Sequence, residues 1–250
     1  MRKKFIGGNW KMNLDGSEAE ALAKAMAQQS ATAADVDIAV FPPFVYLERV
    51  AKVLAGSKVQ LGAQDVYFES KGAFTGEISV GMLKDVGCSC VLVGHSERRH
   101  VLMESDELIN KKLHAALAGG LDVVLCVGEK LEQREAGQTN DINKTQLING
   151  LKGVSAEQMS KITIAYEPVW AIGTGKTASK EQAQEVHAFV RSVLTAIFDG
   201  GIAEQVRIQY GGSVKPANAA ELLGQKDVDG ALVGGASLNA DDFMAIINAG

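Results

Sequence analysis

The chain has 250 residues, of which 46% are hydrophobic and 22% are charged, and its formal net charge at pH 7 is -5. This composition is typical of a folded globular protein with a large core, and an α/β barrel of this length usually forms one domain. The acidic balance leaves no basic stripe for a phosphate backbone and no apolar run is long enough to cross a bilayer, so we expect neither nucleic acid nor a membrane as a partner.

Eight short apolar runs are spread along the chain, and segments with helical periodicity separate most of them. Several runs, such as residues 90–93 and 123–127, are continuously apolar, as is typical of strands buried on both faces of a parallel sheet. Eight such units predict an α/β fold, a single (β/α)8 barrel domain over residues 1–250, with an open doubly wound sheet as the alternative. The runs begin near Phe5, Asp37, Val59, Ser89, Asp122, Ile162, Val206 and Gly230.

Two helix starts can be read from capping-box spacing. Ser17 is followed three residues later by Glu20, and Ser179 is followed by Gln182 in the same way. The second pair predicts a helix over residues 180–198 with one core-facing stripe. That stripe consists of Ala183, Val186, Val190, Val193, Leu194 and Ile197.

The cysteines and histidines indicate neither a disulfide framework nor a metal centre. The odd number of cysteines, all in apolar runs, predicts buried reduced thiols in a cytoplasmic protein. The histidines are scattered without the spacing of metal ligands, so we expect no bound metal. These residues are Cys88, Cys90, Cys126, His95, His100, His114 and His187.

Polar or glycine-rich residues follow six of the eight runs. In a (β/α)8 barrel the active face is built from the connections that follow the strands, so we expect these groups to meet there. Taken singly, each could be a solvated strand end. The groups are Asn9-Trp10-Lys11, Gln64-Asp65, His95-Ser96-Glu97, Glu167, Gly211-Gly212-Ser213 and Gly234-Gly235.

The stretch 164–178 combines a carboxylate with a glycine-containing loop. Glu167 ends the sixth apolar run, and the loop after it begins at Pro168 and contains Gly173. This order predicts a general base at a strand end, with a lid that closes over it and excludes water. The Gly-Lys-Thr within the loop is not a nucleotide-binding P-loop, because that motif requires a glycine where Trp170 stands.

Motifs along the whole chain resemble those of the triosephosphate isomerase family. The resemblance implies a TIM barrel and a glycolytic and gluconeogenic aldose-ketose isomerase, which needs no cofactor. Its substrates would be dihydroxyacetone phosphate and D-glyceraldehyde 3-phosphate, interconverted through an enediol or enediolate. The motifs are GGNWKMN (7–13), GAFTGEIS (72–79), VGHSERR (93–99), AYEPVWAIGTGKTAS (165–179), YGGSV (210–214) and LVGGASL (232–238).

The resemblance also implies catalytic roles. Glu167 is the base, and His95 and Lys11 are the electrophiles that stabilise charge on the substrate oxygens, with Asn9 as a further polar contact. A glutamate base paired with a neutral histidine is the known arrangement of that family. The role of Glu97 is less defined, and an ion pair with Lys11 is one expectation.

The phosphate group and the lid involve a second set of residues. By resemblance, backbone N–H groups of Gly173, Ser213, Gly234 and Gly235 bind the phosphate, aided by a short helix after the eighth strand. Residues 168–178 form the lid. Pro168 starts it, Ile172 and Leu232 press on Glu167 from apolar sides, and Tyr210 holds the closed lid through its hydroxyl.

The long connection 65–79 is expected to carry a partner surface, because it is long for its place and contains Tyr67, Phe68 and Phe74. The resemblance implies a homodimer in which Thr75 reaches towards Asn9 and Lys11 of the neighbouring subunit. Departures from the family pattern are mild: Lys180, Leu102 and Asp65 replace a frequent Pro, Phe and Asn.

Two other functions remain open at this level. A barrel acting on a different sugar phosphate would share the phosphate site, and a catalytically silent binding barrel would share the fold. The silent reading is disfavoured because both Glu167 and His95 are present. A paired-carboxylate glycosidase is disfavoured because it has no use for a phosphate site or a lysine.

Overall fold

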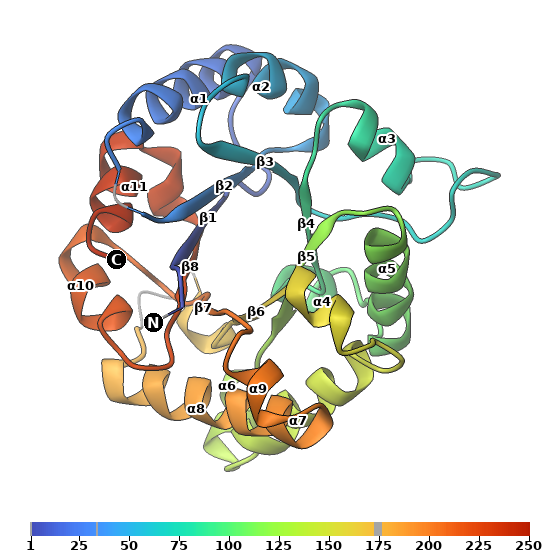
Figure 1. Ribbon diagram of the computed structural model, residues 1–250, viewed down its shortest axis with the longest axis vertical. Coiled ribbons are helices and arrows are strands. Elements are labelled where there is room, and N and C mark those ends of the chain that lie inside the picture. The colour runs from blue at the N-terminus through green and yellow to red at the C-terminus, as the bar shows by residue number, and fades with distance from the viewer. Residues whose placement is uncertain (1, 34, 173–176) are drawn as a thin grey trace.

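The computed structural model describes residues 2–33, 35–172 and 177–250. Its eight strands are all parallel and pair in chain order, and β1 pairs with both β2 and β8, which closes the barrel (Figure 1). The (β/α)8 barrel is therefore confirmed and the open sheet is excluded. The strands are β1 (Phe5–Asn9), β2 (Asp37–Phe41), β3 (Val59–Ala63), β4 (Cys90–Val93), β5 (Asp122–Val127), β6 (Ile162–Tyr166), β7 (Ile208–Tyr210) and β8 (Gly230–Val233).

The helices form a ring around the barrel (Figure 1). Within the described residues, no helix is both long enough and apolar enough to cross a membrane. The helices are α1 (Gly16–Ser30), α2 (Leu47–Leu54), α3 (Val80–Asp85), α4 (Ser96–His100), α5 (Asp106–Ala118), α6 (Leu131–Glu135), α7 (Thr139–Gly150), α8 (Lys180–Ile197), α9 (Gly200–Ala203), α10 (Pro216–Leu223) and α11 (Ala240–Ile247).

The continuous apolar runs are explained by two cores. Side chains alternate along a strand, so one set fills the barrel interior and the other packs against the helices. In β5, Val124 and Cys126 belong to the interior cluster, whereas Val123 and Leu125 belong to the outer one. All three cysteines are buried and unpaired, as expected.

The two predicted helix caps had different outcomes. Ser179 and Gln182 form the predicted capping box at the start of α8. The prediction for the first helix was wrong, because Asp15 caps α1 and its partner is Glu18. The Asp15 carboxylate accepts the backbone N–H groups of Ser17 and Glu18, both at 2.9 Å. A carboxylate two residues ahead of Ser17 thus satisfies the free N–H groups of the first turn.

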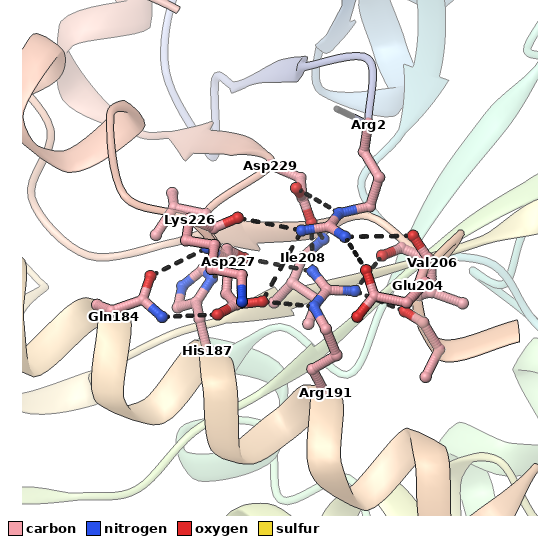
Figure 2. A network of polar contacts seen from close by, with 12 residues as sticks. Arg2, Gln184, His187, Arg191, Glu204, Val206, Ile208, Lys226, Asp227 and Asp229 are labelled. Carbon is pink, nitrogen blue, oxygen red and sulfur yellow. Dashed lines mark hydrogen bonds and ion pairs between the residues drawn. The ribbon is translucent and has the colours of Figure 1, made fainter. Parts of the chain in front are cut away.

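A polar network ties the chain start to α8 and to the connection before β8 (Figure 2). The Arg191 guanidinium lies 2.7 Å from Asp227 and 2.6 Å from Asp229. Arg2 also reaches Asp229 at 2.7 Å, and Asp229 accepts the backbone N–H of Ile208. This network lies at the amino-terminal ends of the strands, where a barrel is stabilised and chemistry is not expected.

Candidate active site

A cavity of about 610 Å³ opens at the carboxyl ends of the strands. Most of the predicted site residues line it, although they come from five different strand ends. Glu97, Pro168, Tyr210 and Thr75 do not line it, and Gly173 lies outside the residues that the structure describes. The predicted residues that line the cavity are Asn9, Lys11, His95, Glu167, Ile172, Ser213, Leu232, Gly234 and Gly235.

The Glu167 carboxylate is 2% exposed and is held by the chain that follows β4. One oxygen accepts the backbone N–H of Ser96 at 2.8 Å, and the other lies 2.9 Å from Nε2 of His95. Burial acts to raise the pKa of Glu167, but His95, the Ser96 N–H and Lys11 outweigh it, so this pKa lies below its usual value. In this arrangement the carboxylate is ionised and points at the histidine.

The hydrogen bonds of His95 assign it a neutral ring. Its Nδ1 accepts the backbone N–H of Glu97 at 3.3 Å, so the proton is on Nε2, which donates to Glu167. His95 is the N-cap of α4, and its ring accepts from the first turn of that helix. The helix begins at Ser96, directly after the histidine. The Nε2–H of His95 is therefore a hydrogen-bond donor directed at the Glu167 carboxylate.

Lys11 follows the carboxyl end of β1 by two residues and has a strained backbone conformation, with φ of 52°. Its backbone N–H donates to the Asn9 side chain at 3.0 Å. Its ammonium lies 2.7 Å from Glu97, which confirms the expected ion pair. Glu97 therefore contacts the lysine without lining the cavity itself.

The end of the cavity after β7 and β8 contains three of the predicted residues. Ser213 follows β7, and Gly234 and Gly235 follow β8, where the turn Gly235–Leu238 begins as the short helix that the sequence predicted. A Cβ on Gly235 would meet no atom within 4 Å, so the space over this glycine is open. A Cβ on Gly234 would lie 3.5 Å from Cε of Lys11, which brings this end close to the lysine.

Tyr210 is buried beneath this face. Burial raises the pKa of its hydroxyl to about 12. The hydroxyl faces the backbone of Ala178, but it makes no hydrogen bond of ordinary length to a described residue. The predicted tie between Tyr210 and the lid therefore stays a prediction.

Sequence reasoning missed Glu129, a fully buried carboxylate beside the lid entry. It accepts hydrogen bonds from Trp170 Nε1 at 3.0 Å and from the Tyr166 hydroxyl at 3.1 Å, and it pairs with Arg134. Glu129 follows the end of β5 by two residues, so the strand-end rule applied to the fifth strand would have found it. Other missed residues that line the cavity are Asn13, Lys215 and Asp242.

Comparison with known proteins decides the family. The family model described as triosephosphate isomerase matches residues 4–250. The chain belongs to the triosephosphate isomerase family. The family's reaction, the interconversion of dihydroxyacetone phosphate and D-glyceraldehyde 3-phosphate without a cofactor, is the reaction of this chain.

Curated relatives carry the same name. The chain is 54% identical over 248 residues to a triosephosphate isomerase of Rhodopirellula baltica, covering 99% of this chain and 98% of the relative. It is 53% identical over 248 residues to a triosephosphate isomerase of Chloroherpeton thalassium, with the same coverage. Membership of the triosephosphate isomerase family excludes the two alternatives, an enzyme acting on a different sugar phosphate and a binding protein without catalytic activity.

Proposed function

We propose that Glu167 is the base of the isomerisation. It would take a proton from the carbon beside the substrate carbonyl, leave an enediol or enediolate, and return a proton to the neighbouring carbon. The supporting observation is the 2.9 Å contact between its carboxylate and His95 Nε2 on the wall of the cavity. No other pair of described side chains joins a buried carboxylate to an N–H donor in this cavity.

Substrate binding would change the basicity of Glu167. A substrate oxygen that accepts the His95 N–H takes the place of the carboxylate oxygen, so Glu167 loses a partner that lowers its pKa. Burial, which acts to raise its pKa, remains, and Ile172 and Leu232 line the same cavity. The carboxylate should therefore become a stronger base once the substrate is in place.

His95 and Lys11 would stabilise the charge that develops on the substrate oxygens. The neutral Nε2–H of His95 supplies a donor, and the Lys11 ammonium supplies a positive charge. Asn9 supports Lys11 by accepting its backbone N–H at 3.0 Å, and it also lines the cavity. Glu97 would hold the ammonium in place through its 2.7 Å ion pair.

We assign the phosphate to the end of the cavity formed by Ser213, Gly234 and Gly235, with Gly173 as a further donor. The open space over Gly235 supports this assignment. The lid would run from Pro168 to residue 178 and be held by Tyr210.

We further propose a homodimer through the connection 65–79. This segment projects from the barrel between β3 and α3 (Figure 1), and Thr75 within it is exposed. Large apolar side chains are exposed on the connections after β1, β2 and β4 as well, among them Met12 at 96%, Val45 at 77% and Met103 at 78%. Apolar exposure on four neighbouring connections supports a surface that a second copy covers. We also propose that residues 1–250 form one domain and that the protein acts in the cytoplasm.

The test of the base is the rate of conversion of D-glyceraldehyde 3-phosphate by the parent and by Glu167→Gln. We expect the rate constant kcat to fall by at least about 10²–10⁴, the range of general acid-base catalysis. The matched control is Glu185→Gln, the same change at an exposed position on α8, which should leave kcat unchanged. Equal rates for parent and Glu167→Gln would assign the proton transfer elsewhere.

The test of the dimer is a dilution series. Specific activity should fall as the enzyme is diluted below its dimer affinity, together with the mass measured by light scattering. A monomer of full activity at every concentration would contradict a site that depends on Thr75 of a neighbour.

A further inference from the structure

Among the described residues, two lysines line the cavity, and they differ in their partners. The Lys11 ammonium is paired with Glu97 at 2.7 Å. Lys215 lines the same cavity, and its side chain forms no ion pair with any residue in the described ranges. Its positive charge is therefore not neutralised by a carboxylate of the described chain.

The backbone around Lys215 is fixed beside the phosphate end of the cavity. The Asn218 side chain accepts the backbone N–H of Lys215 at 2.8 Å and donates to the carbonyl of Ser213 at 3.2 Å. One side-chain amide thus joins Ser213 and Lys215, which are separated by a single residue. Pro216 opens α10 directly afterwards, and its ring limits the backbone further.

We propose that Lys215 is a specificity-determining residue that attracts the phosphate dianion of the substrate into the cavity. The proposal rests on the proposed phosphate site at Ser213, Gly234 and Gly235. An exposed lysine is too well solvated to hold the phosphate alone, but its field reaches several ångströms and raises the rate of association of an anion. The effect should depend on the charge of the substrate and on salt.

The other charges that line the cavity make this contribution necessary. Glu167 and Asp242 are carboxylates, and both repel a phosphate. Lys11 is paired with Glu97, so among the described residues that line the cavity Lys215 is the cation without an ion-pair partner. Asp242 is exposed near the start of α11. Removing its negative charge should have the opposite effect to removing the positive charge of Lys215.

The experiment compares kcat/KM of the parent and Lys215→Gln. With D-glyceraldehyde 3-phosphate at about 10 mM ionic strength, kcat/KM of the variant should be lower than that of the parent by roughly threefold to tenfold. This is the size expected for one exposed charge that steers a ligand. The difference should shrink towards none at about 0.5 M, where the Debye length is only a few ångströms. With unphosphorylated D-glyceraldehyde the two enzymes should be equal.

Two variants serve as controls. Lys144→Gln removes the same charge from an exposed position on α7, outside the cavity, and should leave kcat/KM unchanged. Asp242→Asn should raise kcat/KM for the phosphorylated substrate at low salt. Equal losses in Lys215→Gln and Lys144→Gln would reduce the effect to net charge, and a loss that persists in high salt or with D-glyceraldehyde would make it structural. Either result overturns the proposal.

Inhibition by inorganic phosphate separates this inference from the proposed site. Gly235→Ala would place a methyl group in the open space over this backbone, where the phosphate is assigned. If Gly235→Ala weakens inhibition but Lys215→Gln leaves inhibition and kcat/KM unchanged, the inference about Lys215 fails and the phosphate site stands. If Gly235→Ala leaves inhibition unchanged, the phosphate site itself is wrong.

Discussion

Gly211 directly follows β7 and lies against the side chain of Glu167. A Cβ built on Gly211 would lie 2.7 Å from Cγ of Glu167 and 3.1 Å from the carbonyl oxygen of Tyr166. The φ of Gly211 is outside the left-handed region, so its backbone itself accepts alanine. Replacing Gly211 with alanine therefore tests mainly how accurately the carboxylate must be placed, because the shorter of the two contacts is with the Glu167 side chain.

The size of the effect follows from the contact distance. Carbon atoms pack best about 3.5–4.0 Å apart, so the Glu167 side chain must move by roughly 1 Å to make room. A displacement of about 1 Å from the productive geometry can cost about 10²-fold in rate, or about 2.7 kcal/mol in the activation barrier. We expect kcat of Gly211→Ala to fall by about this factor with a smaller change in KM.

The assay is steady-state conversion of D-glyceraldehyde 3-phosphate, with urea unfolding as a check on the fold. Gly200→Ala, at a position where a Cβ would meet no atom within 4 Å, is the matched control and should keep the parent rate. In the Glu167→Gln background, Gly211→Ala should cost little more, because the two changes act on the same group. Full activity of Gly211→Ala, or an equal further loss without the carboxylate, would refute this account of the site.

Two further predictions concern stability. Burial lowers the pKa of His187 from 6.5 to about 4. As pH falls, this histidine therefore binds a proton in the unfolded chain before it does so in the folded protein. The unfolding free energy should drop by about 3 kcal/mol between pH 6.5 and 4. His187→Gln should reduce this pH-dependent loss in urea unfolding. Its unfolding free energy at pH 8, where the histidine is neutral in both states, gives the packing cost of the substitution separately. A pH dependence equal to that of the parent would contradict the role given to His187. Arg191→Met should cost about 3–5 kcal/mol in unfolding free energy, because it removes the buried guanidinium from Asp227 and Asp229 and leaves Arg2 as their remaining ion-pair partner among the described residues. Arg49→Met removes the exposed ion pair with Glu20 at 3.4 Å and should cost at most about 1 kcal/mol. Equal costs for the two variants would rule out a stabilising role for the polar network around Arg191.

Much of the fold could be predicted because its signals are local. Continuous apolar runs marked the strands, since both faces of a barrel strand are buried, and most starts were confirmed within one residue. The seventh strand was predicted from Val206 but begins at Ile208. The first helix cap was misplaced because two acceptors, Asp15 and Ser17, compete within three residues, and the carboxylate forms the box.

What the sequence determined by itself is which groups are available for chemistry. The polar residues after six strands were predicted to meet on one face, because the carboxyl ends of parallel strands share an edge. Their types already defined a base, an imidazole donor and a lysine.

Tertiary structure decided how those groups are used. The contact between Glu167 and Ser96 joins residues 71 positions apart, and the hydrogen bonds that make His95 neutral and lower the pKa of Glu167 exist only once β4 and β6 are in the barrel. The same holds for Glu129, which three aromatic or basic partners surround, and for Lys215, which has a lining position but no ion pair with a described residue. Local periodicity carries no information about such distances, because closing the barrel is what brings distant strand ends together.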